Sequence, residues 1–202
     1  MKLYGHPMAT NPRRVGIYLA EKGLDIERVD VNTAAGEHKR PEFLAKNPAG
    51  KIPVLELDDG SYLTESAAIV EYLEDRFPEP PMIGVTAEAR GRTRAIEQIG
   101  NDLIIRAHIV LLHSHAHFAG RTEQNPAVAV AVQPLVDELL GMLEHHLGDN
   151  PFLAGQAPTI ADCTVFPLFQ TCRVRLHLPF GAEYPRLDAW YERFAQRPSA
   201  VW

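Results

Sequence analysis

Hydrophobic and polar positions in residues 1–80 alternate between the period of a strand and that of a helix. The pattern predicts strands at 2–4, 26–31, 52–57 and 62–64, and helices at 12–23, at 41–45 and from Ser66 to Phe77. In the strand predicted at 26–31, the pattern does not decide which of the two faces is buried. Asp-Gly at 59–60 favours a tight reversal between the last two strands. The order β-α-β-α-β-β-α indicates a small mixed sheet with helices packed on its faces.

After the proline-rich segment 78–81, the strand-like patterns end and long amphipathic stripes begin. Helices are predicted around 96–110, 132–143 and 187–194, and a further helix is predicted to open at Thr159. AVAVAV at 127–132 alternates as a strand does, but an alanine-rich helix is the better interpretation beside that stripe. Thr159 and Asp162 are spaced as a helix-start capping box, and Pro167 should bend or end that helix. We therefore expect two domains, 1–80 and an all-helical 86–202.

Composition narrows the function classes. Of the 202 residues, 46% are hydrophobic and the formal net charge is −6, so affinity for nucleic acid or anionic lipid is not expected. No run of about 18 apolar residues predicts a membrane span, and the N-terminus lacks a signal-peptide pattern. Cys163 and Cys172 alone make a disulfide framework or a zinc site improbable. These features favour a cytoplasmic protein.

The segments 47–56 and 64–66 carry the most informative chemistry. Pro53 begins a strand, where a proline either marks a sheet edge or forms a cis peptide that exposes the Ile52 backbone. Glu65 and Ser66 stand at a helix N-terminus, which favours a carboxylate, and the Glu65 carboxylate suits an ammonium group. Together they fit the zwitterionic end of a small peptide. The structural alternative is an N-cap followed by a turn.

GHPMATNPRRV, GEHKRPEF, NPAGKIPVLE, TESAAIVEYL and TIADCTVF, in this order, resemble the glutathione transferase family over essentially the whole chain. The first two are most similar to the phi-type enzymes of plants and their bacterial relatives. The resemblance implies an α/β thioredoxin-like N-terminal domain that binds glutathione and an all-α C-terminal domain. It also implies a homodimer, and it assigns a folding role to Thr159 and Asp162.

The same resemblance implies a glutathione site residue by residue. Glu65 and Ser66 match the pair that holds the γ-glutamyl end, and Ile52 and Pro53 match the cis-proline step beside the cysteinyl part. His38 and Lys51 match positions that face the glycyl carboxylate, with Lys39 a weaker candidate. A solvated basic loop is the alternative for residues 38–40. Met8, Arg106 and His108 are candidates for lining the co-substrate site.

The catalytic position departs from the family pattern. The phi-type serine aligns with Ala9, which cannot donate a hydrogen bond to the glutathione thiolate. Asn11 and Thr10 are the nearest donors, with Asn11 slightly favoured and the loop N–H groups a third possibility. Capping of the following helix is the alternative role of Thr10 and Asn11. No cysteine occurs in this loop, so dithiol exchange is not expected.

We therefore expect a transferase that joins the glutathione thiolate to small hydrophobic electrophiles. The alternatives are a glutathione-dependent disulfide or peroxide reductase and a non-catalytic glutathione- or ligand-binding protein. His108, His113, His115 and His117 form a histidine-rich run in which His113 and His117 have the i,i+4 spacing of helical metal ligands. No acidic residue completes a metalloprotease pattern there, and we expect no metal.

Overall fold

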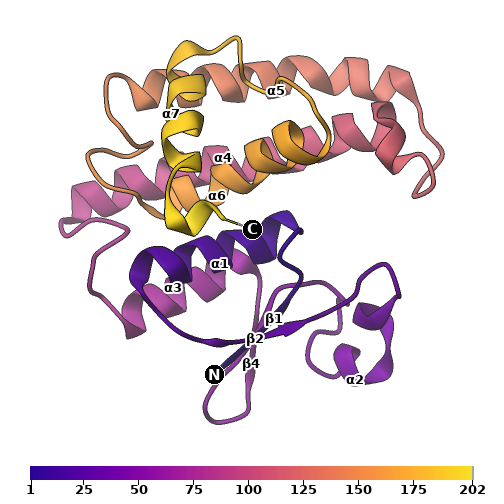
Figure 1. The fold of residues 1–202 in the computed structure, drawn as a ribbon, viewed down its shortest axis with the longest axis vertical. Helices are drawn as coiled ribbons and strands as arrows, with labels where there is room; N and C mark the ends of the chain where they lie inside the picture. Colours follow the sequence, from indigo (N-terminus) through magenta and orange to yellow (C-terminus); the bar gives the residue numbers. More distant parts are fainter. Residues whose placement is uncertain (202) are drawn as a thin grey trace. The chain divides into compact units, whose positions relative to one another are not determined.

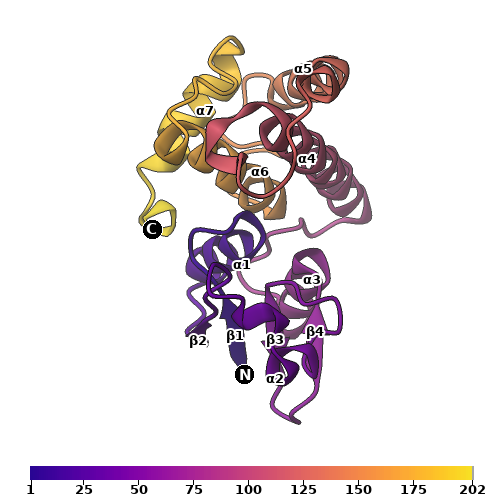
Figure 2. The same ribbon diagram turned by 90° about the vertical axis from the view of Figure 1, so that its right-hand side faces the viewer.

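The computed structural model describes residues 1–201, which divide into two compact units. The first unit contains residues 1–83 and the chain end from residue 195 onward, and the second contains residues 84–194. Figures 1 and 2 show the sheet and its helices in the first unit and only helices in the second.

The first unit is built on a four-stranded sheet in the order β2-β1-β3-β4. β1 pairs parallel with β2 and antiparallel with β3, which pairs antiparallel with β4. The strands are β1 (Lys2–Gly5), β2 (Glu27–Asp30), β3 (Val54–Glu56) and β4 (Tyr62–Thr64), and the helices are α1 (Thr10–Lys22), α2 (Pro41–Leu44) and α3 (Ser66–Arg76). All seven elements occur where the hydrophobic pattern predicts them.

Helices cover both faces of this sheet. α1 and α3 lie side by side on one face (Figures 1 and 2). On the other face Phe43 of α2 packs with Val31 and Val54, and Tyr4 and Ile52 border this cluster. Because successive strand residues point to opposite faces, Val54 contacts α2 while Leu55, also fully buried, belongs to the opposite face.

A buried ionic network fixes α1 against α3. Glu74 of α3 accepts hydrogen bonds from Tyr18 Oη at 2.6 Å and from the Met82 N–H at 2.8 Å. Its carboxylate also lies 2.8 Å from Lys22 Nζ, and both side chains are excluded from solvent. Since each charged atom has a partner, the cost of burying this ion pair is offset by hydrogen bonds at both ends.

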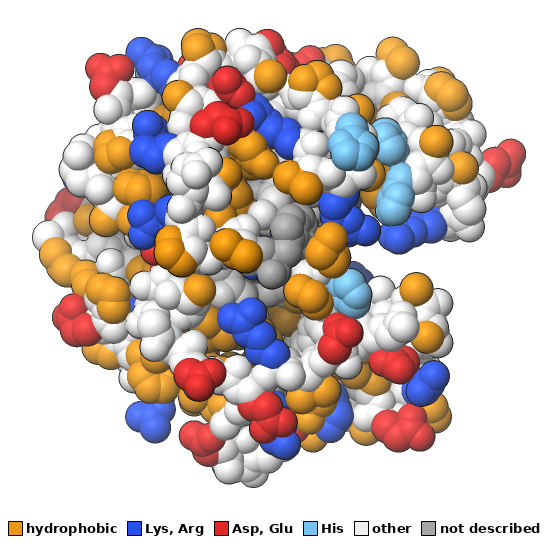
Figure 3. Space-filling model, viewed as in Figure 1, with side chains coloured by type: hydrophobic (Ala, Val, Ile, Leu, Met, Phe, Trp, Pro, Cys, Tyr) orange, Lys and Arg blue, Asp and Glu red, His pale blue; other side chains and the backbone are white. Residues whose placement is uncertain are grey.

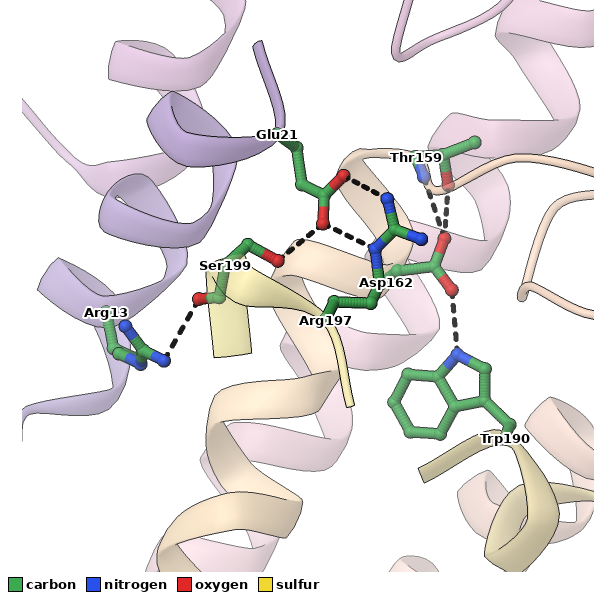
Figure 4. Close-up of polar contacts among 7 residues, drawn as sticks. All are labelled: Arg13, Glu21, Thr159, Asp162, Trp190, Arg197 and Ser199. Carbon is green, nitrogen blue, oxygen red and sulfur yellow. Dashed lines mark hydrogen bonds and ion pairs between the residues drawn. The ribbon is translucent and has the colours of Figure 1, made fainter. Parts of the chain in front are cut away.

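The end of the chain returns to α1 (Figure 4). Arg197 pairs with the Glu21 carboxylate through two hydrogen bonds of 2.6 and 2.7 Å, and the Ser199 hydroxyl donates to the same carboxylate. Arg13 Nη2 donates to the Ser199 carbonyl at 3.1 Å. Burial raises the pKa of Glu21, but the hydrogen bonds from Arg197 and Ser199 outweigh it and lower the pKa overall.

The second unit is helical throughout its regular elements. They are α4 (Ala87–Ser114), η2 (Ala116–Phe118), α5 (Pro126–Leu147), α6 (Ile160–Gln170), η3 (Thr171–Arg175) and α7 (Pro185–Ala195), whose last residue lies in the first unit. α4 packs against both α5 and α6. Gly100 allows the approach to α6, since a Cβ there would lie 2.7 Å from Val165 Cγ2. Residues 127–132 are helical, as predicted.

The start of α6 is held by one buried carboxylate (Figure 4). Thr159 and Asp162 form the predicted capping box. Asp162 also accepts hydrogen bonds of 2.9 Å from the Leu153 N–H and 2.8 Å from Trp190 Nε1. Pro167 does not end the helix, which continues to Gln170 and then widens into the π-helix η3. Asp162 therefore connects the α6 start to both a preceding loop and α7.

Within residues 1–201, α5 is the single helix long and apolar enough to span a membrane, with a mean hydropathy of 1.4 in its most apolar window. It packs on α4 through Val136, Leu140 and Leu143, which are buried. Passing this length and hydropathy test is weak evidence for a membrane span, because the core helices of globular proteins pass it too.

Candidate functional site

The β3–β4 hairpin brings the two informative segments of the sequence together. Val54 pairs with Thr64, so Pro53 and Glu65 flank the same rung of the ladder. The Ile52–Pro53 peptide is cis. The backbone N–H and C=O of Ile52 form no backbone hydrogen bond within the part of the chain that the structure describes. These groups can therefore pair with an extended peptide.

Beside this open backbone lies the N-terminus of α3. Ser66 is the first residue of the helix and is 8% exposed. Glu65 precedes it with a φ of 65°, a conformation that non-glycine residues rarely adopt. Backbone strain of this kind persists where the surrounding structure imposes it, often at ligand sites. The arrangement presents a carboxylate from Glu65 next to the unpaired N–H groups that begin α3.

A buried arginine adds positive charge at this helix start. Arg14 of α1 is 2% exposed, and its Nη1 lies 3.4 Å from Ser66 Oγ. A guanidinium and a helix N-terminus both favour an anion, whereas Glu65 favours a cation. The site therefore offers complementary charge to a group that carries both an ammonium and a carboxylate.

The predicted basic residues approach from the loop that precedes Pro53. Lys39 Nζ donates to the carbonyls of Ala49, at 3.3 Å, and Gly50, at 3.0 Å, and so joins the 37–39 turn to this loop. The buried Nδ1 of its neighbour His38 has no hydrogen-bond partner within residues 1–201. Lys51 is exposed. The structure thus brings together the loops that carry His38 and Lys51.

The buried side chain of Asn47 holds the backbone of this loop through hydrogen bonds. It is 4% exposed, and its amide donates to the Lys51 carbonyl at 2.7 Å and accepts from the Ala49 N–H at 3.1 Å. Gly50 has a φ of 55°, and a Cβ on it would lie 2.8 Å from the His38 carbonyl oxygen. Both residues position the backbone that leads to Ile52.

The candidate thiol-activating residues occupy the first turn of α1. Ala9 is the N-cap and supplies no side-chain cap, while Thr10 and Asn11 are the first two helical residues. The capping alternative for Thr10 and Asn11 is therefore wrong. Thr10 is buried and lies four residues before Arg14, on the same helical face, whereas Asn11 is exposed. Their backbone N–H groups have no acceptor among the described residues.

Sequence reasoning missed Arg14 and Asn47 as members of this site. Arg14 lies in the quoted segment GHPMATNPRRV, but nothing in a helical pattern distinguishes a buried arginine from a solvated one. Asn47 directly precedes Pro48 in a predicted loop, where asparagine commonly hydrogen-bonds the nearby backbone. That preference was a usable signal for a loop-shaping residue.

A cavity of about 420 Å³ lies at the other end of the sheet, beside β2. Its walls include His6, Pro7, Arg13 and Arg28, and none of the six predicted binding residues contributes to it. Burial and the neighbouring Arg28 lower the pKa of Arg13 to about 10. The six binding residues thus form an open surface built from loops and helix starts, whereas Pro7 and Pro12, which flank the candidate thiol donors, line this cavity.

The histidine run does not form the helical pair that its spacing suggested. α4 ends at Ser114, so His117 lies outside it in η2, and His113 Nδ1 accepts a hydrogen bond from the Asn125 N–H. The i,i+4 premise is therefore wrong. No group of three or more potential metal ligands occurs in residues 1–201. Cys163 and Cys172 are buried, and burial raises the pKa of Cys172 to about 12.

Comparison with known proteins identifies the family. The sequence model described as "Glutathione S-transferase, N-terminal domain" matches residues 1–75, and that of the C-terminal domain matches residues 101–198. "Glutathione S-transferase 2" of Saccharomyces cerevisiae is 34% identical over 98% of this chain and 87% of its own length. "Maleylacetoacetate isomerase" of Pseudomonas aeruginosa is 34% identical over 94% of this chain and 86% of its own.

Comparison with solved structures points to the same family. The crystal structure of a glutathione S-transferase domain-containing protein from Marinobacter aquaeolei VT8 superimposes with a TM-score of 0.86 at 32% identity, covering 100% of both chains. The expected fold, a thioredoxin-like domain followed by an all-α domain, is confirmed. The chain belongs to the glutathione S-transferase family, whose co-substrate is glutathione, and is an enzyme of this family.

Proposed function

We propose that the first unit binds glutathione and ionises its thiol, and that the enzyme transfers glutathione to small hydrophobic electrophiles. The observation that carries this proposal is the register of the β3–β4 hairpin, in which Val54 opposes Thr64. This register brings the open backbone of Ile52 next to Glu65 and Ser66 at the start of α3.

Each end of the tripeptide has its own partners in this proposal. The γ-glutamyl ammonium pairs with Glu65, and the γ-glutamyl carboxylate accepts hydrogen bonds from Ser66 and the first N–H groups of α3. The cysteinyl backbone pairs with Ile52, next to Pro53. The glycyl carboxylate lies toward His38 and Lys51. The Arg14–Ser66 contact and the unpartnered His38 Nδ1 support this orientation.

The thiol lies toward the start of α1. Asn11 donates its side-chain amide to the thiolate, with Thr10 the alternative donor. The helix N-terminus and the unpaired N–H groups of both residues also favour the ionised sulfur. The thiolate attacks an electrophilic carbon, a carbon–sulfur bond forms, and a leaving group departs or the product retains both parts after addition. Ala9 provides no donor.

The proposal also covers the localisation, the physiological role, the domain bounds and the oligomeric state of the enzyme. We place the enzyme in the cytoplasm, with a role in detoxification, and assign glutathione binding to a domain 1–80 that precedes an all-helical domain 86–202. We propose a homodimer. Leu135 and Met142, seven residues apart on one face of α5, are exposed, and we propose that this face takes part in the association.

The test compares three glutathione-dependent reactions of the purified protein. Conjugation of 1-chloro-2,4-dinitrobenzene should exceed reduction of a mixed disulfide and of cumene hydroperoxide, and Glu65→Gln should weaken glutathione binding about tenfold. Faster disulfide or peroxide reduction than conjugation would replace the transferase assignment by the reductase alternative. Glutathione binding without any of these reactions would leave only a binding protein.

A further inference from the structure

The cavity of about 420 Å³ beside β2 has no role in the proposed glutathione site. Its walls belong to the first unit and are mainly apolar side chains and glycines of β1, β2 and the start of α1. Its volume lies within the range of about 300–1,000 Å³ that is usual for small-molecule sites. We refer to it as the β2 cavity.

The β2 cavity lies on a different side of α1 from the proposed glutathione site. Pro12 and Gly16, four residues apart, share the helical face that lines the cavity. Thr10 and Arg14 share another face, and Arg14 contacts Ser66 there. Residues two positions apart on a helix do not face the same side, so the two faces are distinct. A ligand in the β2 cavity therefore leaves the proposed γ-glutamyl site open.

Arg28 of β2 holds its guanidinium against α1 at the wall of the cavity. Its Nη2 donates to the Gly16 carbonyl at 3.3 Å, and a Cβ on Gly16 would lie only 3.4 Å from its Nη1. This carbonyl is the single hydrogen-bond partner of the guanidinium within residues 1–201, and no carboxylate there pairs with it. A guanidinium has five N–H donors, so most of those of Arg28 remain available to a ligand.

Arg13 adds a second, buried positive charge to the same wall. It is 5% exposed, and its Nη2 donates to the Ser199 carbonyl at 3.1 Å (Figure 4). Burial and then the charge of Arg28 lower the pKa of Arg13 to about 10, so the two guanidinium groups lie close enough to repel each other. Arg13 keeps its own contacts, and its field favours a carboxylate at Arg28.

An acidic side chain completes the polar rim of the cavity. Asp30 follows Arg28 by two residues in β2 and lies on the same face of the strand, about 6.6 Å farther along it. Both side chains are exposed, and the Asp30 carboxylate forms no hydrogen bond or ion pair within residues 1–201. Figure 3 shows basic, acidic and apolar side chains interspersed over the first unit, so its surface there does not carry a single sign of charge. The rim therefore offers one cation and one anion to a ligand.

We propose that the β2 cavity binds a free α-amino acid with an apolar side chain. The carboxylate of the ligand pairs with Arg28, and its ammonium group pairs with Asp30. Its side chain packs against the apolar walls, which include Leu3, Pro12 and Val29. A simple carboxylic acid would leave Asp30 without a partner, and a simple amine would leave Arg28 without one. This site goes beyond the proposed function and does not depend on it.

The test uses L-leucine and two analogues that each lack one of its charges. L-Leucinamide keeps the ammonium group, and 4-methylpentanoate keeps the carboxylate. In calorimetric titrations of the full chain without glutathione, leucine should bind about tenfold or more tightly than each analogue. If leucine does not bind, or binds no more tightly than one of the analogues, the proposal is overturned.

Two substitutions separate the two charges of the rim. Arg28→Gln should remove the preference for leucine over leucinamide and keep that over 4-methylpentanoate, whereas Asp30→Asn should do the reverse. Lys2→Gln and Glu27→Gln are the matched controls, because these residues pair with each other at 3.4 Å on the neighbouring strands and lie outside the cavity walls. Circular dichroism verifies that all four variants fold. Equal losses in the variants and the controls would contradict the assigned roles of Arg28 and Asp30.

The location of bound leucine must be distinguished from the proposed γ-glutamyl site, which also favours a zwitterion. Leucine affinity should stay within about twofold at saturating glutathione and in Glu65→Gln, because the two sites are separate. The nuclear magnetic resonance signals of the Gly16 and Val29 N–H groups should shift on titration with leucine. Displacement of leucine by glutathione, or loss of its binding in Glu65→Gln, would place it in the γ-glutamyl site and overturn the proposal. Since the titrations need no glutathione, a failure of the proposed function would leave their outcome unchanged.

Discussion

Arg14 Nη1 lies 3.4 Å from the hydroxyl oxygen of Ser66, and this contact joins α1 to the N-terminus of α3. Both residues are buried, so the arginine charge acts on the helix start with little screening by water. This hydrogen bond therefore couples the start of α3, which carries the proposed γ-glutamyl site, to the helix that carries the proposed thiol donors, in addition to the Glu74 network farther along both helices.

Ser66→Ala should weaken glutathione binding about tenfold, because it removes a hydroxyl that donates to a charged carboxylate. The protein should remain folded, since the helix keeps its backbone hydrogen bonds. Isothermal titration calorimetry measures the affinity. Ser61→Ala is the control, because the Ser61 hydroxyl lies in the exposed hairpin turn and donates to Asp59, its one side-chain partner within residues 1–201. Equal affinities of the two variants would remove Ser66 from the site.

Gly50→Ala should reduce both stability and glutathione affinity. Gly50 has a φ of 55°, and its added Cβ would lie 2.8 Å from the His38 carbonyl oxygen. Gly36→Ala is a matched control with a φ of 71° and no atom within 4 Å of the added Cβ. It should cost about 1 kcal/mol of unfolding free energy, whereas Gly50→Ala should cost about 1–3 kcal/mol more. Thermal unfolding compares them, and equal losses would contradict the close packing of the His38 loop.

Glu74→Ala should destabilise the protein by about 3–5 kcal/mol, because it leaves Lys22 charged and buried without its partner. The double variant Glu74→Leu with Lys22→Met removes both charges and should recover much of this loss. Urea unfolding of the three proteins gives the free energies. If the double variant is no more stable than Glu74→Ala, the loss of the hydrogen bonds to Tyr18 and Met82 accounts for the destabilisation, and the unpaired Lys22 charge does not.

The Glu21–Arg197 pair should make stability depend on acid pH. The folded pKa of Glu21 lies below its unfolded value of about 4.3, so its stabilising contribution is present above that value and lost as pH falls through the folded pKa. Glu21→Gln should lower the unfolding free energy at pH 7 by about 1–2 kcal/mol and by less at pH 3. Parallel pH profiles of wild type and variant would contradict a lowered pKa.

Much of the fold followed from the sequence because its signals are local. Gly23, with a φ of 68°, ends α1 where predicted, and the Thr159–Asp162 capping box begins α6. The start of α1 at Thr10 was missed, since Ala9 has no capping side chain to announce it. The π-helix at Thr171–Arg175 was also missed, because a π-helix differs from an α-helix in its backbone hydrogen bonds and the segment TCRVR carries no residue signal for that change.

The candidate site was less predictable than the fold, for a physical reason. Glu65, Ser66 and Pro53 lie in segments with clear turn and helix-start signals, so their types and positions suggested chemistry. Arg14 and Asn47 act through tertiary contacts, which no local pattern contains. The predicted pairing of His113 with His117 failed for a different reason. The end of α4 at Ser114 is marked by no Gly or Pro, so nothing in the sequence indicates that the helix stops before His117.

The central claim is that the start of α1 ionises bound glutathione, and ultraviolet titration of the thiolate against pH tests it most directly. The bound thiol should titrate well below its free value of about 8.5, and Asn11→Ala, or failing that Thr10→Ala, should abolish the shift. A bound thiol that titrates at its free value in the wild-type protein would contradict the account.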